Sequence, residues 1–360
     1  MRADFEEYAS EIEDGLNDDS NSSAVSLFKT LDDFEEEDAR WVIDGWMPEG
    51  QITVLASDGG VGKTTLWCDI AAAVSNGSSC ILDPVGTIRK PSRVLFMSAE
   101  DSIKTVLKKK LRAAGANMAN IVAPDFSANG GELLHTLKFG TEAMTNAIRL
   151  VKPALCIFDP IQGFVPPEIN MGNRNSMRDC LAPLVTLGEE TGTTFLIIVH
   201  SNKRKAASGR DRIADSADLW DIARSVWMAG YSDDEGVRYL SNEKNSYAEK
   251  QKTLLFSIDE NGRAVYEGTT WKRDREFQDD KAISTSAPKR EDCRRWMLMR
   301  LNSAGGSMLT RQLEDDAKAE GYANATIRRA KDSLKAQGDV FYQQRRHEWH
   351  VCIAPVPSDI

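Results

Sequence analysis

A lysine and two threonines follow a glycine-rich stretch, in an order that could bind a chain of phosphates. The stretch reads Ser57-Asp58-Gly59-Gly60-Val61-Gly62-Lys63-Thr64-Thr65. Glycines let backbone N–H groups close around phosphate oxygens, the ammonium of Lys63 can reach the β- and γ-phosphates, and the hydroxyl of Thr64 can ligate Mg²⁺. The usual pattern has glycine where Ser57 stands. The predicted phosphate-binding residues are Ser57, Gly59, Gly60, Val61, Gly62, Lys63, Thr64 and Thr65.

The residues around this stretch predict a strand before it and a helix after it. An apolar run at 52–55 precedes the glycines and a second one at 66–74 follows them. Further apolar runs at 93–99, 121–123, 154–158 and 194–199 alternate with helical patterns near 102–114, 140–151 and 176–191, and short strands and hairpins are expected from 224 to about 266. Near-continuous apolar strands are typical of a parallel sheet that is covered on both faces. The sequence therefore predicts an α/β fold with a largely parallel central sheet.

Three polar side chains stand where predicted strands end. Asp159 closes one apolar strand, as expected of a carboxylate that holds Mg²⁺ opposite Thr64. Glu100 follows a second strand and could deprotonate an attacking water, although Glu100 or Asp101 could instead cap the next helix. His200 ends a third strand and could hydrogen-bond the γ-phosphate, with a purely structural histidine as the alternative.

The order of the loop lysine, the strand-end Glu, Asp and His and a later Arg resembles the RecA-type ATPases of the AAA class grouped with the plasmid replicative helicase RepA. The resemblance covers about residues 41–268. It implies a RecA-like P-loop fold, ATP and Mg²⁺ as cofactors, and a ring hexamer in which an arginine of the neighbouring subunit completes each ATP site. The matching residue is Arg224, with Lys244 as a second candidate. Related helicases often carry a basic residue two positions after such a lysine, where this chain has Ser246, so Arg224 is the better candidate.

The resemblance also implies two loops that line a central channel and contact single-stranded DNA. One spans 161–177, and the other follows His200. Basic side chains gather in the second loop, where they suit contacts to a DNA backbone, although a solvated basic loop is the alternative. These predicted DNA-binding residues are Lys203, Arg204, Lys205, Arg210 and Arg212.

Charge is distributed unevenly along the 360 residues. Residues 1–40 carry 14 acidic and 3 basic side chains, so they are expected to form a solvated or partner-docking segment outside the core. Six scattered cysteines without a C-x-x-C pair favour reduced, buried thiols. The chain has neither a basic-then-apolar signal sequence at its start nor a long apolar run, which favours a cytoplasmic protein without a membrane partner.

The remaining tail reads as a separate small domain. After an ATPase core at 41–272, residues 273–289 are polar and predict a linker, and 290–353 predict three helices and a hairpin, as in a winged helix-turn-helix. The third helix carries Arg328, Arg329 and Lys331, which could contact duplex DNA. Such domains also serve as protein–protein adaptors.

Three functions compete at this stage. The first is a Mg-ATP-dependent DNA helicase or DNA-translocating hydrolase of replication or recombination, with replication proteins as further candidate partners. The alternative is a non-translocating, DNA-binding loader or regulatory ATPase. A partition-type ATPase is disfavoured, because Asp58 stands where that family has its signature lysine.

Overall fold

The computed structural model describes residues 31–126, 132–172, 174–201, 209–213, 217–232, 234, 236–322, 324–345 and 348–354. The chain forms two units, at 1–40 and 41–360. In the first unit the described residues begin with one short 3-10 helix, Leu31–Asp33. Most of the acidic segment, 1–30, lies outside the described residues.

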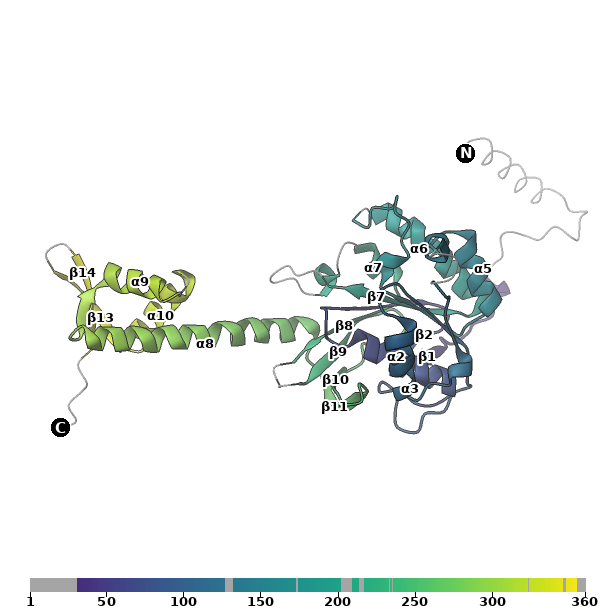
Figure 1. The fold of residues 1–360 in the computed structure, drawn as a ribbon, viewed down its shortest axis with the longest axis horizontal. Coiled ribbons are helices and arrows are strands. Elements are labelled where there is room, and N and C mark those ends of the chain that lie inside the picture. The colour runs from purple at the N-terminus through teal and green to yellow at the C-terminus, as the bar shows by residue number, and fades with distance from the viewer. Residues whose placement is uncertain are drawn as a thin grey trace, which may run out of the picture. The chain divides into compact units, whose positions relative to one another are not determined.

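The second unit is built around a nine-stranded sheet of order β11-β10-β9-β8-β3-β7-β6-β4-β5 (Figure 1). Six neighbouring strands run parallel: β3 (Ile52–Ser57), β4 (Val94–Ser98), β5 (Ile121–Val122), β6 (Leu155–Asp159), β7 (Thr194–His200) and β8 (Ser225–Tyr231). Three antiparallel strands extend the sheet beyond β8: β9 (Arg238–Asn245), β10 (Thr253–Ile258) and β11 (Ala264–Thr270). The predicted α/β fold with a largely parallel sheet is confirmed.

Helices cover both faces of this sheet, as its apolar strands require. One face packs against α2 (Lys63–Asn76), the π-helix η2 (Ile103–Leu107) and α3 (Lys108–Ala113). The opposite face packs against α5 (Glu142–Val151), α6 (Arg174–Thr191) and α7 (Ala217–Ile222). Figure 1 shows α2 and α3 on one side of the sheet and α5 and α6 on the other. Neighbouring strand residues such as Val54 and Leu55 enter different cores, so the period of two along each strand fills both.

Shorter elements complete the second unit up to α7. They are β1 (Trp41–Ile43), β2 (Met47–Pro48), η3 (Met118–Asn120), α4 (Glu132–Thr136), η5 (Ile161–Gly163) and η6 (Gly209–Arg212). The hairpin of β1 and β2 was not foreseen from the sequence. It places Trp46 edge-on against Trp227 of β8, with ring centroids 5.6 Å apart, which buries both indoles.

The C-terminal part contains α8 (Asp274–Ser303), β12 (Ser307–Leu309), α9 (Thr310–Ala319), α10 (Asn324–Ala336), β13 (Val340–Arg345) and β14 (Glu348–Ile353). Its three strands form a separate sheet of order β12-β14-β13. A hydrophobic cluster of its own, which includes Met297, Leu313, Leu334 and Val351, joins the end of α8 to the other elements.

The polar segment 273–289 is a correction, because it forms the first part of helix α8 and not an irregular linker. Two contacts explain this start: the backbone N–H of Arg273 donates to Glu276 at 2.8 Å, and Phe277 stacks on Tyr239 with centroids 4.1 Å apart. Capping and burial of the first turn favour the helix over the polar sequence that follows.

All six cysteines are buried and unpaired, as predicted. Among the helices in the described ranges, none is long and apolar enough to cross a bilayer.

Candidate functional site

The glycine-rich stretch forms a tight loop between β3 and α2. Gly60 and Gly62 adopt positive φ angles of 81° and 104°, and a Cβ atom on Gly62 would lie 2.7 Å from the side chain of Ile258. Only glycine fits there without strain. Tyr231, at the end of β8, donates its hydroxyl to the carbonyl of Gly60 at 2.9 Å, so a side chain from a neighbouring strand braces the loop.

Lys63, the first residue of α2, points its ammonium into this loop. The Nζ atom donates to the carbonyl oxygens of Ser57 (3.2 Å) and Asp58 (3.1 Å) and to Ser57 Oγ (3.2 Å). Burial lowers the pKa of Lys63 below its ordinary value, while the carboxylates of Asp159, Asp58 and Glu100 oppose that shift. The ammonium therefore sits in a confined, polar position at the N-terminus of a helix, where anions bind favourably.

Asp159 ends β6 on the same edge of the sheet and is almost fully buried. The indole N–H of Trp67, one turn after Lys63 in α2, donates to Asp159 Oδ2 at 2.7 Å and fixes the carboxylate. Burial raises the pKa of Asp159, and this hydrogen bond opposes the shift.

The oxygen donors at this edge fit a magnesium ion. Thr64 and Asp159 supply a hydroxyl and a carboxylate, the type of ligand that Mg²⁺ takes beside phosphate oxygens and water. The described residues contain no cluster of three or more His, Cys, Asp or Glu side chains that could hold a metal without such outside ligands.

Glu100 and His200 meet at the mouth of the loop. The ring of His200, which follows Val199 at the end of β7, places Nδ1 3.4 Å from the Nζ atom of Lys63 and Nε2 3.6 Å from Glu100 Oε1. The helix after β4 is capped by Ser102, whose Oγ accepts from the backbone N–H of Thr105 at 3.3 Å. The capping alternative for Glu100 and Asp101 is therefore wrong, and both carboxylates remain in the loop before the helix.

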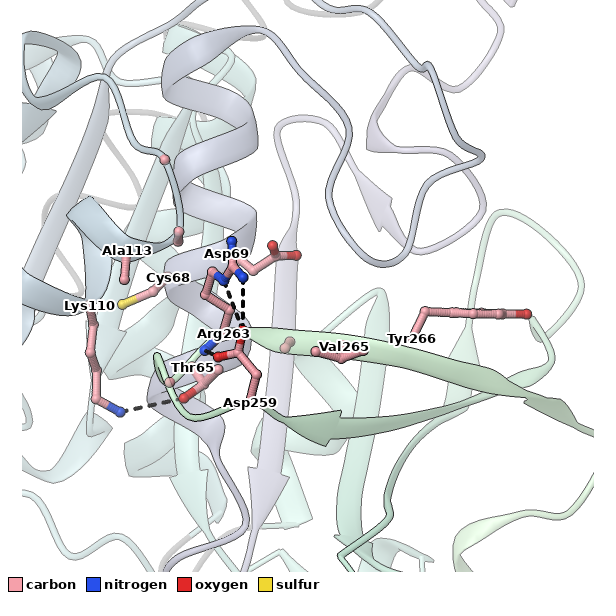
Figure 2. Close-up of a pocket in the computed structure, with 13 residues that line it drawn as sticks. Thr65, Cys68, Asp69, Lys110, Ala113, Asp259, Arg263, Val265 and Tyr266 are labelled. Atoms are coloured by element: carbon pink, nitrogen blue, oxygen red, sulfur yellow. Dashed lines mark hydrogen bonds and ion pairs between the residues drawn. The ribbon is translucent and has the colours of Figure 1, made fainter.

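A cavity of about 530 Å³ opens beside Thr65 (Figure 2). Thr65 and Asp69 of α2, Lys110 of α3, and the turn between β10 and β11 line it. Figure 2 shows Lys110 reaching Thr65, where Nζ lies 3.4 Å from Oγ1, and Arg263 paired with Asp259 across 2.9 Å. The cavity thus continues from the first turn of α2 along the helix.

Arg224 and Lys244 lie away from this loop within their own chain. The backbone N–H of Arg224 donates to the carbonyl of Ile52, the first residue of β3, whereas the loop follows the last. The ammonium of Lys244 donates to the carbonyls of Trp220 (2.8 Å) and Asp221 (3.1 Å). Burial lowers the pKa of Lys244. Neither cation can serve the phosphate site of its own subunit.

The predicted DNA-binding residues fall into different classes. Lys203, Arg204 and Lys205 lie outside the described residues. Arg210 pairs with Asp221 at 2.5 Å and stays partly exposed.

Arg212 is a correction: its guanidinium is buried and pairs with the buried carboxylate of Asp274. Because a buried carboxylate needs a cation beside it, Arg212 is held inside the protein and does not face DNA.

In the C-terminal part, Arg328 and Arg329 are exposed on α10. Lys331 is partly buried and forms an ion pair with Glu314 of α9. The two arginines are thus the cations of this helix that are open to a phosphate backbone.

Three contacts at the site were not foreseen: Trp67 on Asp159, Tyr231 on Gly60, and the pairing of Arg212 with Asp274. For Trp67 a signal existed, because it stands four residues after Lys63 and so lies on the same helix face. The other two depend on strand neighbours that are distant in sequence.

Comparison with known proteins gives a consistent assignment. Residues 20–206 match the family described as "AAA domain", which includes the glycine loop, Glu100, Asp159 and His200. The DNA repair protein RadA of Bacillus subtilis is 26% identical over 171 residues, 47% of this chain and 31% of RadA. RadA of Synechocystis is 23% identical over 230 residues, 61% of this chain and 41% of that protein. The chain thus spans less than half the length of these relatives.

A solved structure of a helicase ATPase domain aligns with 61% of this chain and 85% of its own, at a TM-score of 0.46 and 15% identity. The family match alone covers more than half of the chain. Together with the loop between β3 and α2 and the strand-end residues around it, this match establishes that the chain belongs to the AAA domain family and is a RecA-type ATPase that resembles the RepA-like helicases.

Proposed function

We propose that this protein hydrolyses Mg-ATP and uses the energy to move along DNA, as a helicase or DNA translocase of replication or recombination. One observation carries the proposal: Lys63, Glu100, Asp159 and His200, from four segments of the chain, converge at the carboxyl edge of the parallel sheet. In such sheets ligands bind beyond this edge. Lys63 then binds the β- and γ-phosphates, and the other three act on the terminal phosphate.

Each residue takes one role in this proposal. Thr64 and Asp159 hold Mg²⁺, which would neutralise charge on the phosphate oxygens. Glu100 accepts a proton from the attacking water, and His200, which lies between Lys63 and Glu100, contacts the γ-phosphate. The cavity beside Thr65 has the position and size to take the nucleoside (Figure 2).

The organisation of the chain follows from this assignment. Residues 41–272 form the ATPase core, α8 leads out of it, and 290–353 form a winged helix domain, for which the separate hydrophobic cluster and the sheet β12-β14-β13 provide the support. Arg328 and Arg329 contact DNA from α10. These exposed arginines also favour the second candidate, a loader or regulator that binds duplex DNA without moving along it.

Turnover of ATP should rise when single-stranded DNA is added, and a duplex with a single-stranded tail should be separated only in the presence of hydrolysable ATP. Phosphate release and strand displacement measure the two effects. Stimulation by DNA without strand displacement would favour the second candidate. Turnover that is indifferent to every DNA tested contradicts both.

We further propose a ring in which Arg224 of one subunit completes the ATP site of the next, because in its own chain Arg224 lies at the opposite edge of the sheet from Lys63. Subunits with Lys63→Ala and subunits with Arg224→Ala should each be inactive alone. Mixed in equal amounts, they should form intact sites at about a quarter of the interfaces of a ring and regain turnover.

A mixture of Lys63→Ala with Glu100→Gln subunits is the matched control, since both residues belong to the same half of the site. That mixture should stay inactive. Absence of recovery in the first mixture, with rings formed, would exclude a shared site that contains Arg224.

A further inference from the structure

The carboxylate of Asp58, inside the phosphate-binding loop, is held by two residues that follow β7. Ser201 donates its hydroxyl to Asp58 Oδ1, and Arg212 lies 3.5 Å from Oδ2. Ser201 and Ile213 form an isolated β-bridge with each other, and the backbone N–H of Ser201 donates to the carbonyl of Ser57 at 2.9 Å. The residues at both ends of the segment 201–213 are therefore fixed against the loop.

Asp58 also touches the lysine that binds phosphate. Its carbonyl oxygen accepts from the Nζ atom of Lys63 at 3.1 Å and from the hydroxyl of Ser57 at 2.9 Å. Because the carboxylate and the carbonyl belong to one residue, contacts that hold the carboxylate also restrict the orientation of the carbonyl. The position of the Lys63 ammonium thus depends on what Asp58 binds.

Arg212 continues this set of contacts to helix α8. Its Nη1 atom donates to Oδ1 of Asp274, the first residue of α8, which has no exposed surface. The hydroxyl of Tyr239 donates to the same oxygen at 2.8 Å, and Gln278, one turn later in α8, donates to that hydroxyl at 2.8 Å. Charges this deeply buried are costly to separate, so Arg212 has little freedom to leave Asp274.

We propose that Arg212 is a positioning residue that joins the phosphate-binding loop, through Asp58, to the start of helix α8, through Asp274. The inference rests on the proposed function, since it assumes that nucleotide binds at Lys63. Its consequence is thermodynamic: if nucleotide and Asp274 both act on Arg212, a change at either end alters the free energy at the other. The first turn of α8 is then sensitive to nucleotide, and nucleotide affinity is sensitive to Asp274.

A double-mutant cycle tests this coupling. The dissociation constant of a fluorescent, nonhydrolysable ATP analogue is measured with Mg²⁺ for the wild-type protein, Asp58→Asn, Asp274→Asn and the double variant. Asparagine keeps the shape of each side chain and removes its charge. Each single variant should weaken binding, and the double variant should deviate from the product of the single effects by about threefold or more.

The matched control replaces Asp316, which pairs with Arg300 in the C-terminal part at 2.8 Å, by asparagine. In combination with Asp58→Asn its effect should be additive. If Asp274 served only to hold the fold together, Asp274→Asn would lower the melting temperature and leave the dissociation constant unchanged, which overturns the inference.

A second measurement avoids the buried variant. Hydrogen–deuterium exchange of the amides at 274–278 should slow when the analogue binds to the wild-type protein, and this effect should be lost in Asp58→Asn at saturating analogue. Exchange that responds equally in both proteins contradicts the link. Should the wild-type protein bind no analogue at all, the proposed function fails and this inference fails with it; binding with an additive cycle overturns only the inference.

Discussion

Lys63→Ala is expected to reduce ATP turnover by at least about 10²-fold, because it removes the only charged donor of the loop that can follow charge onto the transferred phosphate. In the structure the ammonium is held by the carbonyls of Ser57 and Asp58, a position from which it can reach phosphate oxygens in the loop. Charge-assisted hydrogen bonds of this type are among the strongest in proteins. Binding of the ATP analogue should weaken together with turnover.

Lys109→Ala is the matched control, since Lys109 lies on the exposed side of α3 and changes the net charge equally. Its turnover should equal that of the wild type. Circular dichroism should show that Lys63→Ala is folded, because alanine is a good helix former at the start of α2. A folded Lys63→Ala variant with normal turnover would mean that phosphate is bound elsewhere.

The sequence predicted the parallel part of the sheet because its strands are short apolar runs bounded by polar residues. The strand ends could be placed for the same reason, so Asp159 and His200 were expected at one edge and are found there. What the sequence shows at these positions is local: a strand, its end and the residue type there.

Other features of the site depend on contacts between residues far apart in the chain. Trp67 and Asp159 are 92 residues apart, and Arg212 and Asp274 are 62 apart. An arginine in a basic, polar segment gives no local sign that a buried carboxylate will receive it, so its exposure was predicted wrongly. The start of α8 was missed for a related reason, because Phe277 needs the ring of Tyr239 to be buried.

The position of Glu100 separates binding from chemistry. Its carboxylate lies at the end of β4, 3.6 Å from the ring of His200, and is largely exposed, whereas the contacts of Lys63 in the loop do not include it. A side chain in this place can accept a proton from water at the terminal phosphate and contributes little to holding the nucleotide. Loss of its basicity should therefore affect the rate of turnover far more than the affinity.

Glu100→Gln is thus expected to bind the ATP analogue like the wild type and to hydrolyse ATP about 10²- to 10⁴-fold more slowly, the usual contribution of a general base. Phosphate release and analogue binding measure the two quantities separately. Glu189→Gln, on the exposed side of α6, controls for the loss of one charge, and Asp101→Asn tests the neighbouring carboxylate. Normal turnover in Glu100→Gln with a large loss in Asp101→Asn would assign the base to Asp101, because both carboxylates precede the helix that Ser102 caps.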